Sequence, residues 1–184
     1  SDEEVRRSEE IVRLLLNSAA EAIYGLDCNG RCTFCNNSFL RLMSYDSEKE
    51  LIGKNVHDLI HHTKVDGSEY PFEECVAHRG FIEGKQTHSE NEMFWRKDGS
   101  SFYAECWSHP ILQNDEVTGA VVTFLDITKR REALQELHNS EELYRSLIEN
   151  IDLGITLIDK DHTIIMTNSA QGRMFGRDVH SFKG

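Results

Sequence analysis

Alternation of apolar and polar residues predicts three consecutive strands in the middle of the chain. Residues 102–112 follow a period of two, which places successive side chains on opposite faces of a sheet. Segments 90–96 and 117–127 predict the strands before and after it. Asp98 and Gly99 lie between the first two strands, and glycine has no Cβ to oppose the positive φ of a tight hairpin turn. The pattern therefore predicts a three-stranded antiparallel meander.

The preceding part of the chain predicts a hairpin followed by a series of helices. Asn29-Gly30 is a hairpin turn signal between two short strands. Phe72, Val76 and Phe81 are expected to face inward on a helix. The expected elements are a helix at 2–18, strands at 21–27 and 31–35, short helices at 39–43, 48–51 and 56–61, and a longer helix at 72–83. Together they predict an α+β fold, in which short helices cover a five-stranded antiparallel sheet and long amphipathic helices flank it.

A second helical region begins at Thr128. Leu134, Leu137, Leu143 and Leu147 form an apolar stripe along it, with charged residues on the other faces. A long amphipathic helix that leaves a domain usually packs against a partner helix. We therefore expect a homodimer that forms through the flanking helices.

The segment from Ser140 repeats the start of the chain without a gap. Asp27 matches Asp159 and Asn36 matches Asn168 at one constant spacing. This repeat predicts a second copy of the domain, which stops after two of its five strands. We expect that the natural protein continues or that another chain completes this copy. The expected divisions are a flanking helix at 1–19, a domain at 20–128, a linker helix at 129–150 and the start of the second copy at 151–184.

Composition narrows the classes of partner. The net charge of −12 argues against sequence-independent binding of nucleic acid, which needs a basic face. No apolar run is long enough to span a bilayer, so any membrane anchor is expected outside this segment. Five cysteines without framework spacing suit a reducing compartment, and we expect a cytoplasmic location.

Three passages in the first copy resemble the PAS sensor domain family. Residues 22–36 are similar to its opening hairpin, residues 94–99 to its C-terminal hairpin, and residues 126–128 to its exit motif into a signalling helix. The resemblance implies a tandem sensory or dimerisation module, typical of the input region of a sensor histidine kinase or a cyclic-di-nucleotide enzyme. It also implies that a small ligand or cofactor occupies a cavity between the sheet and the short helices, and that the exit helix relays its presence.

Eight residues are candidates for these roles. Asp126 and Thr128 are expected to hydrogen-bond at the junction of the last strand and the exit helix, and so to relay the signal. The candidates for ligand binding are Tyr24, Asn36, Phe39, Cys75, His78 and Trp107.

The resemblance leaves the cofactor open. His78 lies on the helix that supplies the axial histidine in haem-binding members of the family, so a haem-based redox or gas sensor is an alternative. No residue distinguishes a flavin site, and the cysteine motif of the photoreactive subgroup is absent. A ligand-free structural spacer, with a cavity filled by its own side chains, is the other alternative.

Metal and catalytic motifs are weak. His57 and His61 are four residues apart on a predicted helix and could share a face, but no carboxylate stands at a clear ligand position. Cys28, Cys32 and Cys35 lie on a hairpin whose alternation separates the last two, so we expect no metal site.

Enzyme motifs are missing as well. His138 lacks the residues that surround a kinase phosphoacceptor, and no P-loop or nucleophile motif is present. We expect no catalytic residues in this segment and an output domain outside it.

Overall fold

The computed structural model describes residues 2–182, which fall into two compact units that divide between Lys129 and Arg130. No helix among the described residues is both long and apolar enough to cross a membrane.

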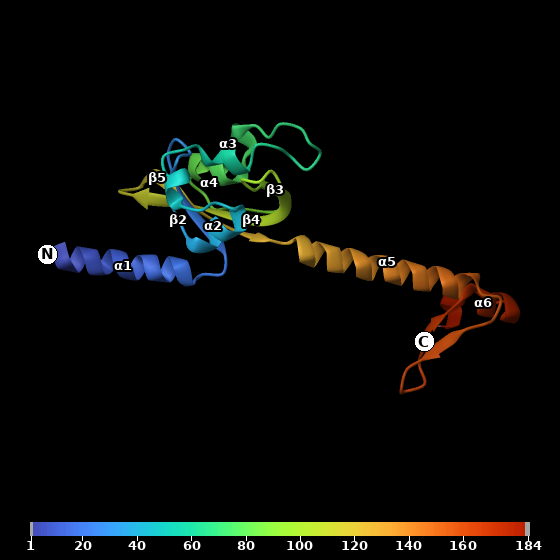
Figure 1. The fold of residues 1–184 in the computed structure, drawn as a ribbon. Coiled ribbons are helices and arrows are strands. Elements are labelled where there is room, and N and C mark those ends of the chain that lie inside the picture. The colour runs from blue at the N-terminus through green and yellow to red at the C-terminus, as the bar shows by residue number, and fades with distance from the viewer. Residues whose placement is uncertain (1, 183–184) are drawn as a thin grey trace. The chain divides into compact units, whose positions relative to one another are not determined.

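The first unit is built on a five-stranded antiparallel sheet (Figure 1). Its strands are β1 (Ala22–Asp27), β2 (Cys32–Cys35), β3 (Thr87–Trp95), β4 (Ser101–Gln113) and β5 (Glu116–Asp126). Their spatial order is β2-β1-β5-β4-β3, so that β5 lies at the centre and pairs with both β1 and β4. The predicted α+β class and five-stranded antiparallel sheet are confirmed.

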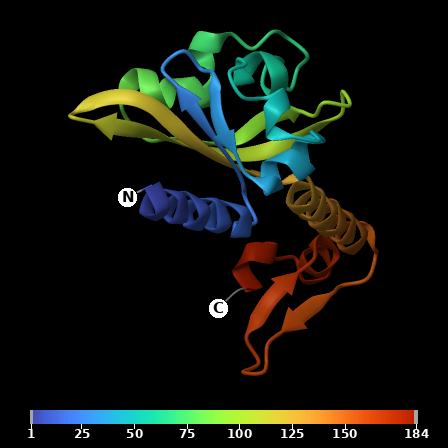
Figure 2. The same cartoon turned by 60° about the vertical axis from the view of Figure 1, so that its left-hand side comes forward.

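Short helices cover one face of this sheet, and α1 lies on the other side (Figures 1 and 2). The helical elements are α1 (Asp2–Ser18), α2 (Asn37–Met43), η1 (Glu48–Glu50), α3 (Val56–Ile60), η2 (Phe72–Glu74) and α4 (Val76–Glu83). The side chain of Asn36 caps α2 and that of Asn55 caps α3.

The prediction of a single helix at 72–83 is wrong. It is broken at Cys75, whose ψ of 123° is extended, and α4 starts anew from there. No glycine or proline marks this break in the sequence. The restart changes the helical phase, so that Ala77 and His78 are buried as well as Phe81, while Val76 is only half-buried.

Interlocking aromatic rings form the core between the sheet and α2. Phe124 from β5 meets the rings of Tyr24, Phe39 and Phe94 edge-on, with centroids 4.6–6.0 Å apart. All four side chains are fully buried. Edge-to-face packing of this kind leaves little free volume.

Asn36 joins three elements of the first unit through its side chain. Its Oδ1 accepts from the backbone N–H groups of Ile23 and Phe39, and its Nδ2 donates to the carbonyl oxygens of Leu16 and Glu21. The side chain thus ties the end of α1 to β1 and to the start of α2.

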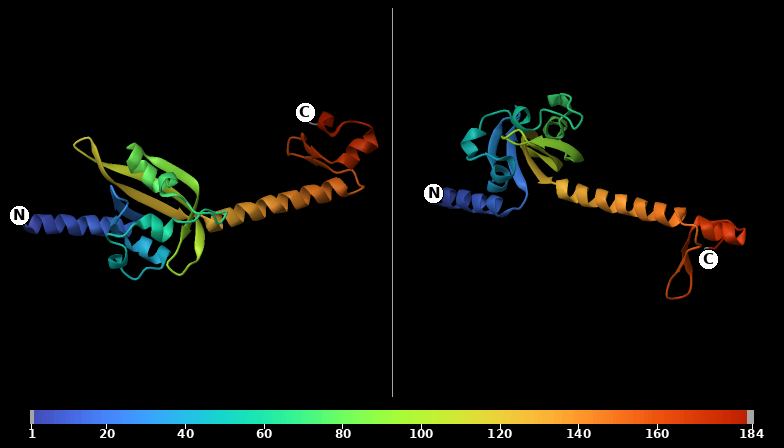
Figure 3. Two further views of the ribbon diagram at one scale, coloured as in Figure 1. Left: turned by 90° about the horizontal axis from the view of Figure 1, so that it is seen from above. Right: turned by 45° about the vertical axis from the view of Figure 1, so that its right-hand side comes forward.

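The second unit is an incomplete version of the same design. It contains all but the first two residues of α5 (Thr128–Asn150), together with β6 (Thr156–Ile158), β7 (Ile164–Thr167), α6 (Ser169–Phe175) and η3 (Val179–Phe182). Strands β6 and β7 form a two-stranded antiparallel sheet, and α5 is one uninterrupted helix (Figure 3).

Asn168 repeats every bond of its counterpart in the first copy. Its Oδ1 accepts from Ile155 and Gln171, and its Nδ2 donates to Ile148 and Leu153. The sequence repeat is therefore also a repeat of local hydrogen bonding.

Candidate functional site

Helices α3 and α4 and the residues at their ends contribute a group of buried titratable side chains. His57 lies on α3 and His61 directly follows that helix, while Cys75 precedes α4 and His78 lies on its first turn. Each is at most 5% exposed. These four residues are called the histidine–cysteine cluster below.

The local backbone structure brings the ring nitrogens and the sulfur of the cluster close to one another. His57 and His61 are one helical turn apart and therefore face the same side. One ring nitrogen of each and the Cys75 sulfur all lie within 4.8 Å of one another. The extended backbone at Cys75 places its thiol at the start of α4, where the helix dipole favours a negative charge.

His61 links the Cys75 thiol to a buried carboxylate. Its Nδ1 lies 3.1 Å from Cys75 Sγ, and its Nε2 lies 2.7 Å from Oε2 of Glu92 on β3. Burial by itself would lower the pKa of His61, but its hydrogen bonds to Cys75 and Glu92 raise that pKa to about 9. Burial likewise favours the neutral forms of its partners, yet the facing histidines hold the pKa of Cys75 well below its usual value, and His61 lowers that of Glu92.

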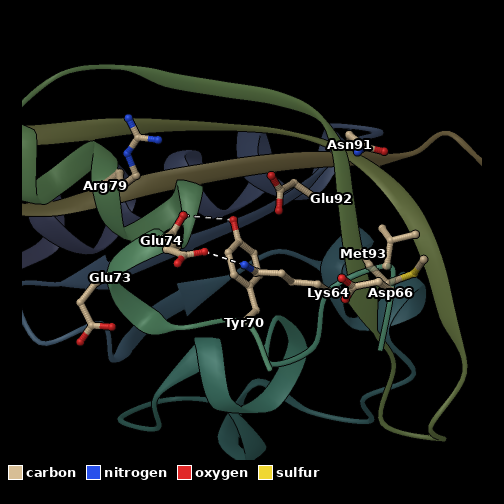
Figure 4. Close-up of a pocket in the computed structure, with 10 residues that line it drawn as sticks. Lys64, Asp66, Tyr70, Glu73, Glu74, Arg79, Asn91, Glu92 and Met93 are labelled. Atoms are coloured by element: carbon tan, nitrogen blue, oxygen red, sulfur yellow. Dashed lines mark hydrogen bonds and ion pairs between the residues drawn. The ribbon is translucent and has the colours of Figure 1, made fainter. Parts of the chain in front are cut away.

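A polar pocket of about 720 Å³ adjoins the cluster (Figure 4). Its lining comes from the loop before η2, from η2 and α4, and from β3: Lys64, Val65, Asp66, Tyr70, Glu73, Glu74, Arg79, Asn91, Glu92 and Met93. Tyr70 donates its hydroxyl proton to the carbonyl of Glu74, and Lys64 Nζ lies 2.6 Å from the Glu74 carboxylate. Tyr70 and Glu92 belong to both places, because they line the pocket and also contact His61.

The six predicted ligand residues do not share one cavity. Tyr24 and Phe39 belong to the aromatic core, and Asn36 is the hydrogen-bonding tie described above. Trp107 is half-buried and stacks on His88, with ring centroids 4.9 Å apart.

Cys75 and His78 lie in the cluster, whereas Phe39 contacts both Tyr24 and Asn36 in the core. None of the six lines the polar pocket. The residues that line the pocket follow no regular alternation of apolar and polar positions, and several are charged. The hydrophobic pattern of the sequence therefore did not predict them.

His78 is packed too closely for haem or another planar cofactor. Its ring centroid is 3.6 Å from that of Phe72, and a Cβ added to Gly30 would stand 2.3 Å from its Nε2. Gly80 brings α4 directly onto the sheet, since a Cβ there would lie 2.5 Å from Ser108 Oγ. The space that a porphyrin would need beside His78 is thus filled by the chain.

The cysteines of the first hairpin stand in three different environments. Cys28 is exposed and bonds the carbonyl of Val117, whereas Cys32 is buried and Cys35 half-buried. Burial raises the pKa of Cys32 to about 12 and that of Cys35 to about 11, which keeps these thiols protonated.

The junction between β5 and α5 is held by Asp126. Its carboxylate accepts from the Thr128 N–H at 2.9 Å and pairs with Arg96 at 3.1 Å. Arg96 also donates to the carbonyl of Leu42 at the end of α2. The Thr128 hydroxyl is buried and has no hydrogen-bond partner among the described residues, so Thr128 takes part through its backbone rather than its side chain.

Family models match both copies of the domain. A model described as PAS fold matches residues 10–127, and a second model, described as PAS domain, matches residues 142–184. No curated protein matches the chain.

Solved structures show the same fold at low sequence identity. An RNA-binding Light-Oxygen-Voltage receptor is 24% identical with a TM-score of 0.58, and the match covers 75% of this chain but 38% of the receptor. The PAS domain of a protein from Colwellia psychrerythraea is 22% identical with a TM-score of 0.52, covering 65% of this chain and 97% of that one. A PAS domain from a two-component sensor histidine kinase is 18% identical with a TM-score of 0.50, covering 66% and 98%.

Proposed function

Because the chain belongs to the PAS family, we propose that it is a sensory module whose polar pocket takes a small ligand and whose exit helix relays the bound state. The observation that carries this proposal is the position of Glu92. It lines the pocket and lies on β3, and β3 leads directly into the Arg96–Asp126 pair that holds the start of α5.

The charge of the pocket supports a cationic ligand. Asp66, Glu73, Glu74 and Glu92 contribute four carboxylates, against the two cationic side chains of Lys64 and Arg79. A small organic amine or guanidinium compound would gain charge-assisted hydrogen bonds there. Lys64 Nζ already lies 5.5 Å from the centre of the Tyr70 ring, so this ring accepts a cation in the pocket.

In this proposal the bound state is relayed to α5 by a displacement of strand β3, and not by a series of mobile side chains. A ligand that displaces Glu92 moves β3, and Arg96 is the first residue after that strand. Arg96 contacts both Asp126 and Leu42, so its displacement changes how the start of α5 is held. Such a ligand acts only by preferring one of the two arrangements.

Dimerisation through the flanking helices is part of this proposal. Helix α1 buries none of its residues, and α5 likewise buries none. Both carry exposed apolar side chains: Val5, Ile11, Val12, Leu14 and Leu15 on α1, and Leu134, Leu137, Leu143 and Leu147 on α5. Light scattering at rising concentration should show dimers, and a monomer at every concentration would refute this part.

In this proposal the catalytic output belongs to another domain. Solved PAS neighbours include one from a two-component sensor histidine kinase, which supports a histidine kinase as the output. Within this chain we assign sensing and no catalytic step.

A panel of defined small molecules tests ligand sensing. Agmatine, arginine, choline and spermidine would serve as cationic probes, with citrate and succinate as anionic ones. We expect a cationic probe to raise the melting temperature and to slow amide hydrogen exchange at residues 126–131. Glu73→Gln should weaken that effect, whereas Glu116→Gln, an exposed carboxylate outside the pocket, should leave it unchanged.

Two outcomes would count against the proposal. Stabilisation by no probe would favour a ligand-free spacer, which the closely packed aromatic core is able to support. Binding without any change at residues 126–131 would refute the relay.

A further inference from the structure

Several buried ring nitrogens of the histidine–cysteine cluster have no hydrogen-bond partner among the described residues. Nδ1 of His57 and both ring nitrogens of His78 are buried without a hydrogen-bond partner among residues 2–182. An unpaired buried polar atom destabilises the folded state, so three in one place require an explanation. His57 belongs with His61 and Cys75 to one close group of possible ligands, and the His78 ring centroid lies 5.6 Å from that of His57.

The outer hydrogen bonds fix how two of these rings point. His57 Nε2 lies 2.8 Å from the carbonyl oxygen of Tyr70, and His61 Nε2 lies 2.7 Å from Glu92. A carbonyl and a carboxylate only accept, so both Nε2 atoms carry protons. The Nδ1 atoms of both rings are thereby directed toward Cys75.

This arrangement is the one that metal-binding histidines adopt. A ligating histidine usually donates its outer N–H to a carboxylate or a backbone carbonyl, which orients the ring and makes its inner nitrogen more basic. Here one ring has the carbonyl and the other has the carboxylate. The sequence offered no such carboxylate, because Glu92 stands 31 residues from His61.

We propose that His57 Nδ1, His61 Nδ1 and Cys75 Sγ bind one transition-metal ion, with His78 as the fourth ligand. A thiolate with two or three imidazoles suits Zn²⁺ and copper, whereas Mg²⁺ and Ca²⁺ prefer oxygen ligands. The metal takes the place of the proton shared by His61 and Cys75, which leaves as binding occurs.

The donor spacing agrees with a four-coordinate ion. Zinc–nitrogen and zinc–sulfur bonds of about 2.0–2.3 Å place neighbouring tetrahedral ligands roughly 3.6 Å apart. The sulfur and the His61 nitrogen are 3.1 Å apart, and all three donors lie within 4.8 Å of one another. Small side-chain rotations would bring these three donors around one ion, and His78, which lies outside this group of three, has to turn further to become the fourth ligand.

This proposal goes beyond ligand sensing and does not depend on it. Metal binding is measured on the chain itself, whether or not the pocket takes an amine and whether or not α5 responds.

Cobalt titration of the reduced, metal-free chain tests the site. Co²⁺ should bind at one equivalent, with a thiolate-to-cobalt charge-transfer band and the intense visible bands of tetrahedral coordination. Cys75→Ser should abolish the charge-transfer band. Glu92→Gln should weaken affinity about 10–100-fold, as loss of an outer carboxylate does elsewhere. The exposed residues supply matched controls, since Cys28→Ser and His109→Gln should both leave the spectrum unchanged.

A second measurement decides the case if Cys75→Ser fails to fold. X-ray absorption of the zinc-loaded chain should give one sulfur and two or three imidazole nitrogens, and His57→Gln should lower the nitrogen count by one. A charge-transfer band that persists in Cys75→Ser, or is lost in Cys28→Ser, would place the metal elsewhere. Absence of any thiolate-to-cobalt band in the folded wild-type chain would overturn the proposal and leave a metal-free thiol–imidazole pair.

Discussion

Asn36→Ala should destabilise the first unit severely, because one side chain satisfies four backbone groups there. The substitution removes the cap of α2 and the bonds to Ile23, Leu16 and Glu21. Loss of a cap costs about 1 kcal/mol, and each further bond contributes about 1 kcal/mol. Some of the released groups reach water at the surface, so we expect a loss of about 3 kcal/mol.

Intrinsic fluorescence gives an assay confined to the first unit. The chain has two tryptophans, Trp95 and Trp107, and both lie on its sheet. Urea unfolding followed by tryptophan emission should show the loss as a lower midpoint with an unchanged slope. A thermal scan should show a melting temperature lower by about 10 °C.

Two variants separate the hydrogen-bond argument from simple loss of volume. Asn36→Asp keeps both acceptor bonds but sets a carboxylate against the carbonyls of Leu16 and Glu21, so it should be as damaging as alanine. Asn168→Ala makes the equivalent deletion in the second copy and should leave the tryptophan transition unchanged. A loss below about 1 kcal/mol for Asn36→Ala would refute the reasoning, since a cap alone accounts for that much.

Three further changes have distinct expected outcomes. Gly30→Ala combines a φ of 73° with a Cβ only 2.3 Å from a nitrogen of the histidine–cysteine cluster, so it should destabilise the fold well beyond the roughly 1 kcal/mol that strain costs. Gly67→Ala is its control, with φ of 84° and nothing within 4 Å; equal urea midpoints for the two variants would contradict the close contact. Phe124→Ala empties the centre of the aromatic core and should cost about 3–5 kcal/mol by the same urea assay, and a loss under 1 kcal/mol would mean that the core is loosely packed. Asp126→Ala removes the cap on the Thr128 N–H and should cost only about 1 kcal/mol, yet it should speed hydrogen exchange in the first turn of α5; unchanged exchange there would show that the cap does not hold the helix.

The fold could be predicted because its signals are local. Two-residue periodicity places side chains on one face of a sheet, and Asp98-Gly99 and Asn29-Gly30 provide turns that need no distant partner. Gly30 and Gly99 both have positive φ, as those turns require. Self-similarity predicted the second copy for the same reason, since it compares the sequence only with itself.

The six predicted ligand residues were placed in different parts of the structure, because burial and function leave the same pattern in sequence. Tyr24 and Phe39 are apolar positions on a strand and a helix, and such positions face inward whether they line a cavity or fill it. Only the packing of Phe124 against both rings shows that they fill it. The break at Cys75 was missed because no residue type there opposes a continuous helix.

The sequence by itself determined the PAS architecture, its repeat and its exit motif. Tertiary structure alone decided which polar groups meet. Cys75 stands 14 residues from His61, and Glu92 stands 31 residues from it, so neither contact follows from spacing. They meet because α3, the restarted α4 and β3 pack around one point, and the low dielectric there makes the resulting contacts between charged groups strong.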